Sequence, residues 1–328
     1  MAQRFRSLVS LLLSCLVLSA CAGSRQAFYP RDGGSPGIEL EEVVFFGQRD
    51  FQCGPAALAM VLHHSGKKVQ PDDLTPQLFL PGRRGSLQLE MIAAARRSGR
   101  IPCPIRPEAA AIAAELAAGR PVLVLQNLGV TWLPVYHYAV VVGLLPGDQV
   151  VLRSGEQRRL VMAGSRFLAT WRRADNWGMV LLRPGELPAG MDLETYFRAL
   201  AAFEITGQPE IARRGYEAAL ERWPRQPLAL FGLGNCLLAA GDEDQAAMVY
   251  RRLLAIEPGH AAAVNNLAEA LSRRGCRRQA LALLDRTLVS SDGGGAFRPT
   301  LQQTRIEIAA RLQEDGDDSG CPPTPDGP

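Results

Sequence analysis

Residues 48–64 read QRDFQCGPAALAMVLHH, and this stretch decides how the first half of the chain is interpreted. From Cys53 onward the run is mostly apolar, with Pro55 near its start and Gly66 just past its end. Proline is favoured in the first turn of a helix and glycine just after its last residue. The stretch therefore predicts a helix over 53–64 that begins at a cysteine. A helix start stabilises a thiolate through its dipole and its unpaired backbone N–H groups, so Cys53 is a candidate nucleophile.

A histidine that can serve Cys53 occurs about eighty residues further along the chain. His137 lies at the head of the apolar run YHYAVVVGL, residues 136–144, which predicts a buried strand. A cysteine nucleophile needs an adjacent base within hydrogen-bonding reach. We therefore predict a site with Cys53 as nucleophile and His137 as general base. The alternative is that Cys53 is a buried structural thiol at the start of its helix.

The segments around these two motifs indicate an α+β domain over residues 43–187. Helices are also expected at 86–97 and 107–118, and strands at 121–126, 136–144, 149–152 and 178–182. Helices followed by strands favour an antiparallel sheet. Gly147 and Asp148 suit a hairpin turn between the second and third of these strands.

The pattern Q-x4-C-G-P-A followed by H-Y-x-V-V-x-G, within residues 43–184, resembles the bacteriocin-processing (double-glycine leader) peptidase family of the papain-like cysteine peptidases. The resemblance implies a papain-like fold with Cys53 as nucleophile and His137 as general base. It also implies that the side-chain amide of Gln48 completes the oxyanion hole. In the family the glutamine usually lies one residue further upstream, which leaves Gln52 as an alternative.

The chain departs from this family where an aspartate orients the histidine. About sixteen residues after His137 the sequence is LRSG, residues 152–155. Arginine cannot accept a hydrogen bond, and Ser154 would accept one without contributing charge. By analogy with dissected catalytic triads, loss of the carboxylate lowers the rate about 10⁴-fold. Ser154 is one candidate for the orienting role, and Asp175 and Asn176 are two others.

Beyond residue 190 the chain changes to a helical pattern with a period of about 34 residues, which is the period of tetratricopeptide helix pairs. Aligned repeats place glycine at the expected inter-helix turn and alanine at the expected close helix crossing: Gly207, Gly241 and Gly275, and Ala212, Ala246 and Ala280. We expect an all-α solenoid of three tetratricopeptide repeats over 191–294 and a capping helix over 295–313. The acidic, Pro- and Gly-rich stretch 314–328 predicts a disordered tail.

The N-terminus predicts export and a lipid anchor. Residues 1–20 combine two arginines with the apolar run 8–18, which suits a signal peptide and is too short to span a bilayer. The run ends in LSAC, residues 18–21, which resembles a bacterial lipobox. The resemblance implies lipidation of Cys21, a tether over 21–42, and a place at the outer membrane facing the periplasm. An ordinary secretory signal with a chance cysteine is the alternative.

Composition and cysteine spacing disfavour two classes of ligand. A net charge of +3 lacks the basic surplus typical of nucleic-acid binding. The Cys and His spacings do not match those of metal ligands, and we expect neither a metal nor an organic cofactor. An odd number of cysteines follows Cys21, so at least one thiol stays free or pairs between chains. Cys236 and Cys276, in neighbouring repeats, either form a disulfide or remain two separate core thiols.

Three functions follow from these patterns. The first is a lipid-anchored cysteine peptidase whose repeats recruit a partner or substrate protein. The second is a catalytically inactive binding or assembly module, which the missing aspartate favours. The third is a thiol acyl or amide transferase on the same scaffold. Trp132, Trp171 and Trp177 either line a substrate groove or pack at strand ends.

Overall fold

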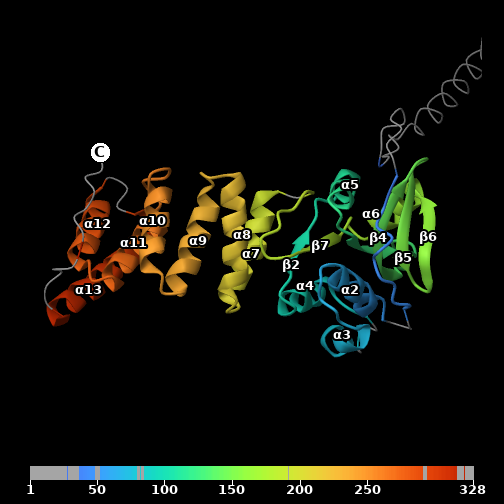
Figure 1. Ribbon diagram of the computed structural model, residues 1–328, viewed down its shortest axis with the longest axis horizontal. Helices are drawn as coiled ribbons and strands as arrows, with labels where there is room; N and C mark the ends of the chain where they lie inside the picture. The colour runs from blue at the N-terminus through green and yellow to red at the C-terminus, as the bar shows by residue number, and fades with distance from the viewer. Residues whose placement is uncertain are drawn as a thin grey trace, which may run out of the picture. The chain divides into compact units, whose positions relative to one another are not determined.

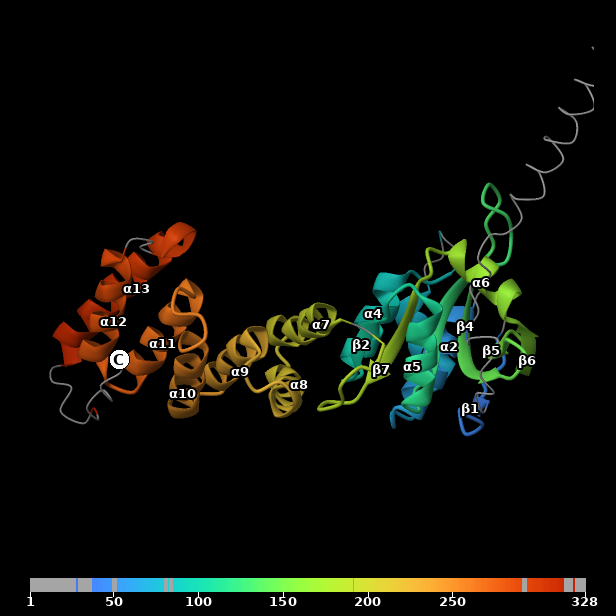
Figure 2. The same ribbon diagram turned by 90° about the horizontal axis from the view of Figure 1, so that it is seen from above.

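The computed structural model describes residues 28, 37–48, 52–79, 82, 85–190, 192–290, 294–315 and 321. The chain forms two compact units, shown in Figures 1 and 2. The first unit is made of residues up to 94 and of 104–180, and the second of 95–103 and residues from 181 onward. The predicted signal peptide and Cys21 lie outside the described residues. Within the described part, no helix is both long and apolar enough to cross a membrane.

An antiparallel sheet is the framework of the α+β fold. The described residues contribute seven strands: β1 Ile38–Glu39, β2 Ile101–Pro104, β3 Val122–Asn127, β4 Tyr136–Leu145, β5 Gln149–Ser154, β6 Gln157–Ala163 and β7 Gly178–Leu182. Their order is β2-β7-β3-β4-β5-β6, and β1 pairs with β4. Gly147 and Asp148 adopt φ angles of 80° and 58° between β4 and β5, which confirms the expected hairpin turn.

The central strands β3 and β4 are buried along most of their length. Helices α2 Cys53–His64 and α5 Ala109–Ala117 pack on both of these strands, and α6 Gly164–Arg172 packs on β3. Helix α3 Pro71–Leu78 packs on α2, and α4 Gln88–Arg97 follows it in the chain. Helix α2 has the predicted bounds, is buried from Gly54 to Leu62, and packs against β3, β4 and β5. This packing places the N-terminus of α2, and with it Cys53, beside the sheet.

The second unit contains the predicted helix pairs. They are α7 Leu193–Ile205 with α8 Pro209–Arg222, α9 Pro227–Ala239 with α10 Glu243–Leu254, and α11 Ala261–Arg273 with α12 Arg277–Val289. The three predicted turn glycines all have positive φ, between 74° and 85°. The three predicted crossing alanines are fully buried. Sequence periodicity therefore located both the turns and the close contacts of the repeats.

The last helix covers the end of the repeats, as predicted, and extends slightly further than expected. Helix α13, Arg298–Asp315, follows a short 3-10 turn, Gly295–Phe297, and packs on α11 and α12. Its Leu301 and Ile308 are fully buried.

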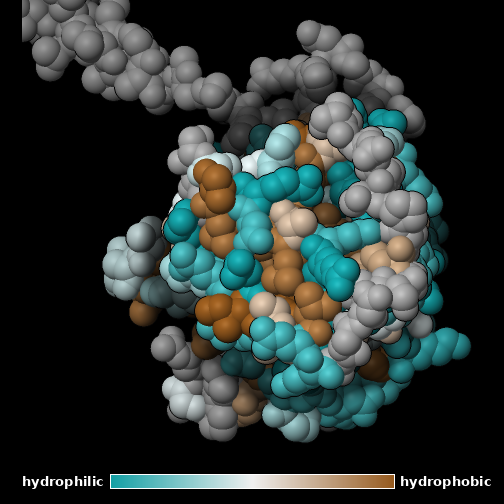
Figure 3. Space-filling view, turned by 90° about the vertical axis from the view of Figure 1, so that its left-hand side faces the viewer, coloured by the Kyte–Doolittle hydropathy of each residue, from teal (hydrophilic) through white to brown (hydrophobic). Residues whose placement is uncertain are grey.

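In Figure 3, apolar and hydrophilic side chains mix on the face of the molecule turned to the viewer. Most of the segment predicted to be disordered lies outside the described residues.

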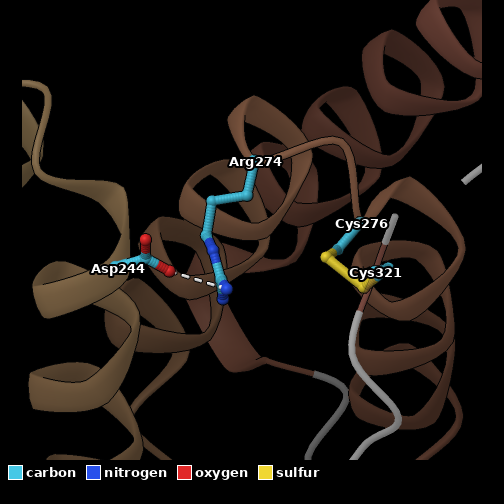
Figure 4. Close-up of a disulfide and its surroundings, with 4 residues drawn as sticks. All are labelled: Asp244, Arg274, Cys276 and Cys321. Carbon is cyan, nitrogen blue, oxygen red and sulfur yellow. Dashed lines mark ion pairs between the residues drawn. A yellow bond between two sulfur atoms is a disulfide. The ribbon is translucent and has the colours of Figure 1, made fainter. Parts of the chain in front are cut away.

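A disulfide joins Cys276 to Cys321, with a Cα–Cα distance of 5.2 Å (Figure 4). The possible Cys236–Cys276 disulfide is therefore wrong, because Cys276 pairs with a cysteine beyond α13, and Cys236 is a free, buried thiol. Sequence spacing could not identify this partner, since the pairing joins residues 45 apart in sequence. An ion pair between Arg274 and Asp244, with a 2.6 Å N–O distance, lies close to the disulfide.

Candidate functional site

Cys53 is the first residue of α2, and its thiol is free and half-buried. Gln52 precedes it without a side-chain capping bond to the described backbone. The next residue, Gly54, allows a close approach by the segment before α4. A Cβ atom on Gly54 would lie only 2.5 Å from Ser86 Oγ and 2.7 Å from Ser86 Cβ. The glycine of the CGP motif is thus required by packing beside the thiol.

Tyr138 connects β4 to the same region. Its hydroxyl donates to the carbonyl of Ser86 at 3.3 Å, and its ring meets Trp177 edge-on at 5.9 Å between centroids. Burial, and then the nearby Cys53, raise the pKa of Tyr138 well above its ordinary value. The hydroxyl therefore stays protonated and remains a donor at neutral pH. The start of β4, the segment before α4 and the N-terminus of α2 meet around Cys53.

His137 is oriented by Ser154, at the end of the neighbouring strand. The distance from His137 Nε2 to Ser154 Oγ is 2.9 Å. Burial lowers the pKa of the His137 ring, because the charged form loses hydration. The ring is therefore neutral at pH 7, and a neutral ring can accept a proton.

Asp175 and Asn176 lie in a turn before β7, and in the described structure neither is bonded to His137. Both have left-handed backbone angles, with φ of 54° and 51°. The Asn176 N–H donates to the carbonyl of Trp171 at 3.1 Å. Of the three candidate orienting residues, Ser154 alone is within hydrogen-bonding distance of the ring, as judged over the described chain.

Arg153 points to a different set of partners from its neighbour Ser154. Its buried guanidinium donates to the main-chain carbonyls of Glu41, Val43 and Arg158. It thereby holds residues 41–43 against the end of β5. Arg153 thus has structural contacts of its own, and Ser154 is the residue that bonds to the His137 ring.

The side-chain amide of Gln48 is fixed by two main-chain groups. Its Nε2 donates to the carbonyl of Tyr138 at 3.2 Å, and its Oε1 accepts from the N–H of Gly155 at 3.1 Å. A primary amide has two N–H donors, so a second one remains for another acceptor. Gln48 thus lies between the start of β4 and the end of β5, next to the residues that flank His137 and Ser154.

Hydrogen bonds connect Gln48, His137 and Ser154 to neighbouring positions of β4 and β5, and Cys53 lies near Tyr138 of β4. Over the described residues, no hydrogen bond joins the Cys53 thiol to the His137 ring. Catalytic hydrogen bonds are often long or misaligned in substrate-free enzymes. The described residues also contain no group of three or more His, Cys, Asp or Glu side chains placed to hold a metal ion.

Ser86 and the contact of Tyr138 with it could not be predicted from the sequence. Tyr138 belongs to the HY motif, but its bond to Ser86 depends on the tertiary approach of two distant segments. The Ser86 Oγ is buried and has no hydrogen-bond partner among the described atoms. Nothing in the local sequence around Ser86 indicates either contact.

Comparisons with known proteins identify the repeats. Tetratricopeptide repeat family models match residues 198–261 and 237–290, so the helical array is one of tetratricopeptide repeats. No curated protein sequence matches the chain. One similar solved structure is the peptidase domain of Streptococcus ComA, a bi-functional ABC transporter involved in a quorum-sensing pathway. The similarity has 20% identity and a TM-score of 0.36, over 43% of this chain and 99% of that chain. At these values the likeness says nothing about activity.

Proposed function

We propose that the chain is a lipid-anchored cysteine peptidase that hydrolyses peptide bonds through Cys53 and His137. The repeats bind the substrate or a partner protein, as tetratricopeptide arrays offer extended binding surfaces. The observation that carries the proposal is the His137–Ser154 hydrogen bond, which orients a neutral ring beside a helix that begins with a free thiol.

In the proposed reaction, the sulfur of Cys53 attacks the carbonyl carbon of a peptide bond while His137 removes the thiol proton. The resulting oxyanion accepts hydrogen bonds from the Cys53 backbone N–H and the remaining Nε2 hydrogen of Gln48. His137 then donates its proton to the leaving amine. Water hydrolyses the thioester and regenerates the thiol. Substrate binding has to draw the thiol and the ring into contact.

The disulfide supports the proposed location. Structural disulfides persist in oxidising compartments such as the bacterial periplasm and are rare in the cytosol. A Cys276–Cys321 bond is consistent with export, which the signal-like N-terminus also predicts. Attachment at Cys21 and the outer-membrane location are proposed from the sequence alone.

A second candidate is an inactive peptidase-like binding module. The neutral Ser154 in place of a carboxylate favours it, because an uncharged partner gives less support to a protonated ring. In this case the Cys53 thiol would react like that of an ordinary free cysteine.

The test is labelling with a peptide that carries a thiol-reactive electrophile, at neutral pH. We expect the chain from Ala22 to be labelled at Cys53 faster than a model thiol. His137→Ala should slow the reaction about 100-fold, the scale of general base catalysis. Cys236 is an internal control, because burial raises the pKa of its thiol to about 12.

Product analysis completes this test. Incubation with a peptide mixture, followed by mass spectrometry, should reveal cleaved peptides with the wild-type chain and none with Cys53→Ala. Ligated or amidated products would instead identify a transferase. Ordinary thiol reactivity, an unchanged rate in His137→Ala and intact peptides would together support the binding module.

A further inference from the structure

The connection between β3 and β4 is an exposed apolar loop next to the proposed site. This β3–β4 loop, residues 128–135, leads directly to Tyr136 and His137, and extends outward in Figure 2 as a green loop beyond α6. Trp132 is 83% exposed and Leu133 61% exposed. The other exposed large apolar side chains of the loop are Leu128, Val130 and Val135. A cluster of this kind is a candidate contact surface.

The loop has a defined backbone structure. Val130 and Leu133 exchange two backbone hydrogen bonds, of 3.2 and 3.1 Å. At the base, Asn127 Oδ1 accepts from the N–H groups of Gly129 and Val135. A Cβ atom on Gly129 would lie 2.3 Å from the Leu133 carbonyl oxygen. These contacts hold the apolar side chains at the surface, so little ordering is needed when they bind a partner.

Charge distribution distinguishes this loop from its neighbour α6. Residues 121–147 contain no Asp, Glu, Lys or Arg. Helix α6 exposes Arg166 and Arg172 and has no acidic residue, and the turn after it adds Arg173 and Asp175. Arg173 donates to the carbonyl of Asn127 at 2.9 Å, which holds the basic end of α6 at the base of the loop.

The described residue nearest in sequence to the proposed lipid anchor packs on the same helix. Phe28 is buried, and its ring packs on Phe167 of α6 with 5.7 Å between centroids. Phe28 is seven positions after Cys21, and a chain of that length spans at most about 25 Å. Phe167 and Arg173 are six residues apart, or about 9 Å along a helix. A lipid on Cys21 would therefore keep α6 and the β3–β4 loop near the bilayer.

We propose that the β3–β4 loop inserts into the interface of an anionic phospholipid bilayer, with the arginines of α6 on the headgroups. Tryptophan prefers this interface, and binding there grows with buried apolar area and with attraction to anionic lipid. The contact gives the first unit a fixed orientation with the His137 end of β4 close to the membrane. It rests on the proposed lipid anchor for proximity, but the loop itself needs no lipidation to bind.

The test uses the chain from Ala22, which lacks the lipid and keeps every described residue. We expect it to co-sediment with vesicles of phosphatidylethanolamine and phosphatidylglycerol, and brominated acyl chains should quench tryptophan fluorescence. The double variant Trp132→Ala, Leu133→Ala should bind at least about tenfold more weakly, because its apolar area is lost. Arg166→Gln with Arg172→Gln should weaken binding to these vesicles and leave the weaker binding to phosphatidylcholine unchanged.

A matched control replaces two exposed apolar residues of the repeats. Ile205 and Val289 are 87% and 86% exposed, and their double alanine variant should bind vesicles like the wild type. Circular dichroism checks that each variant is folded. The proposal is overturned if the wild type and the loop variant bind vesicles equally. It is also overturned if the loop variant keeps vesicle binding but loses peptide labelling at Cys53, which would make the loop a peptide-docking surface.

Lipidation is measured separately, by incorporation of labelled palmitate at Cys21 in cells. Because the vesicle experiment uses protein without the lipid, an unmodified Cys21 would contradict the anchor and leave the loop result intact. Peptide cleavage is likewise an independent measurement, so failure of the peptidase proposal is distinguishable from failure of this one.

Discussion

Ser154 lies where the resemblance to the bacteriocin-processing peptidases predicts a carboxylate, and its neutral hydroxyl bonds to the proposed base. Ser154→Asp should therefore raise the rate of Cys53 labelling about tenfold or more, because a carboxylate stabilises the ring when it takes up the thiol proton. Ser154→Ala should lower the rate severalfold, since the ring then loses its orienting bond. The measurement is the labelling rate at neutral pH.

Ser165→Asp is the control for this prediction. Ser165 is exposed on α6, and an added negative charge there should leave labelling unchanged. Equal labelling rates in Ser154→Asp, Ser154→Ala and the wild type would contradict a positioning role for Ser154.

His137 gives a prediction about pH. Burial lowers the pKa of its ring below the ordinary 6.5, so the unfolded chain binds more protons than the folded chain as the pH falls below about 6.5. The free energy of unfolding therefore falls as the pH is lowered from 6.5 through the lowered pKa of His137. Above pH 6.5 the ring is neutral in both states, and His137 does not change the free energy of unfolding with pH. We expect an NMR titration of the ring to have its midpoint below 6.5.

His137→Gln removes this titration. The free energy of unfolding of the variant should depend less steeply on pH than that of the wild type between about pH 5 and 6.5. A ring midpoint at or above 6.5, or parallel stability curves, would contradict the buried neutral ring.

At the scale of single elements, sequence patterns predicted those segments that carry their own start and stop signals. Helix α2 has its predicted bounds because an apolar run lies between Cys53 and Gly66. Helix α3 was missed because Pro76 lies inside it, and proline normally ends a helix. Its start is stabilised by a capping box at Gln70, which is not one of the usual N-cap residues. The strand β6 was missed because QRRLVMA lacks alternation and lies at the edge of the sheet.

The candidate site was predictable only where residue type indicates chemistry. Cys53, His137 and Gln48 stand out by motif, and Ser154 could be named only as one of three orienting candidates. The bond of Tyr138 to Ser86, and the need for glycine at position 54, depend on the approach of segments far apart in the chain. No local pattern encodes such an approach.

Close packing of the repeat helices requires glycine at position 234, and a substitution there tests this requirement. A Cβ atom there would lie 2.5 Å from the ring of Tyr250, which is fully buried. Gly234→Ala should lower the free energy of unfolding of the repeats by about 1–3 kcal/mol, the usual range for overpacking. Urea unfolding followed by circular dichroism measures the change.

Gly259 is the matched control, because no atom lies within 4 Å of its added Cβ. Gly259→Ala should leave the free energy of unfolding within about 0.5 kcal/mol of the wild type. If the two alanine variants were equally stable, the close crossing at Gly234 would not be a constraint on the fold.

For the molecule as a whole, the two units differ in the state of their cysteines. The first unit holds the free, half-buried Cys53, whereas the repeats hold the Cys276–Cys321 disulfide and the buried Cys236. The disulfide joins residues 45 apart in sequence and closes a loop that contains α12 and α13. Chain entropy gives such a loop a stabilisation of about 4 kcal/mol at most.

Replacing Cys276 and Cys321 by serine should therefore lower the thermal midpoint of the repeats by several degrees. The rate of Cys53 labelling should not change, because the disulfide lies in the other unit. Without reduction, the denatured wild-type chain from Ala22 should take up alkylating reagent at Cys53, Cys103 and Cys236. After reduction it should also be alkylated at the two disulfide cysteines.

Protein secreted to the periplasm is the material for this measurement, since cytosolic expression keeps thiols reduced. Full alkylation without reduction in that material would contradict the disulfide, and an unchanged midpoint in the double serine variant would contradict its role in holding the end of the repeats.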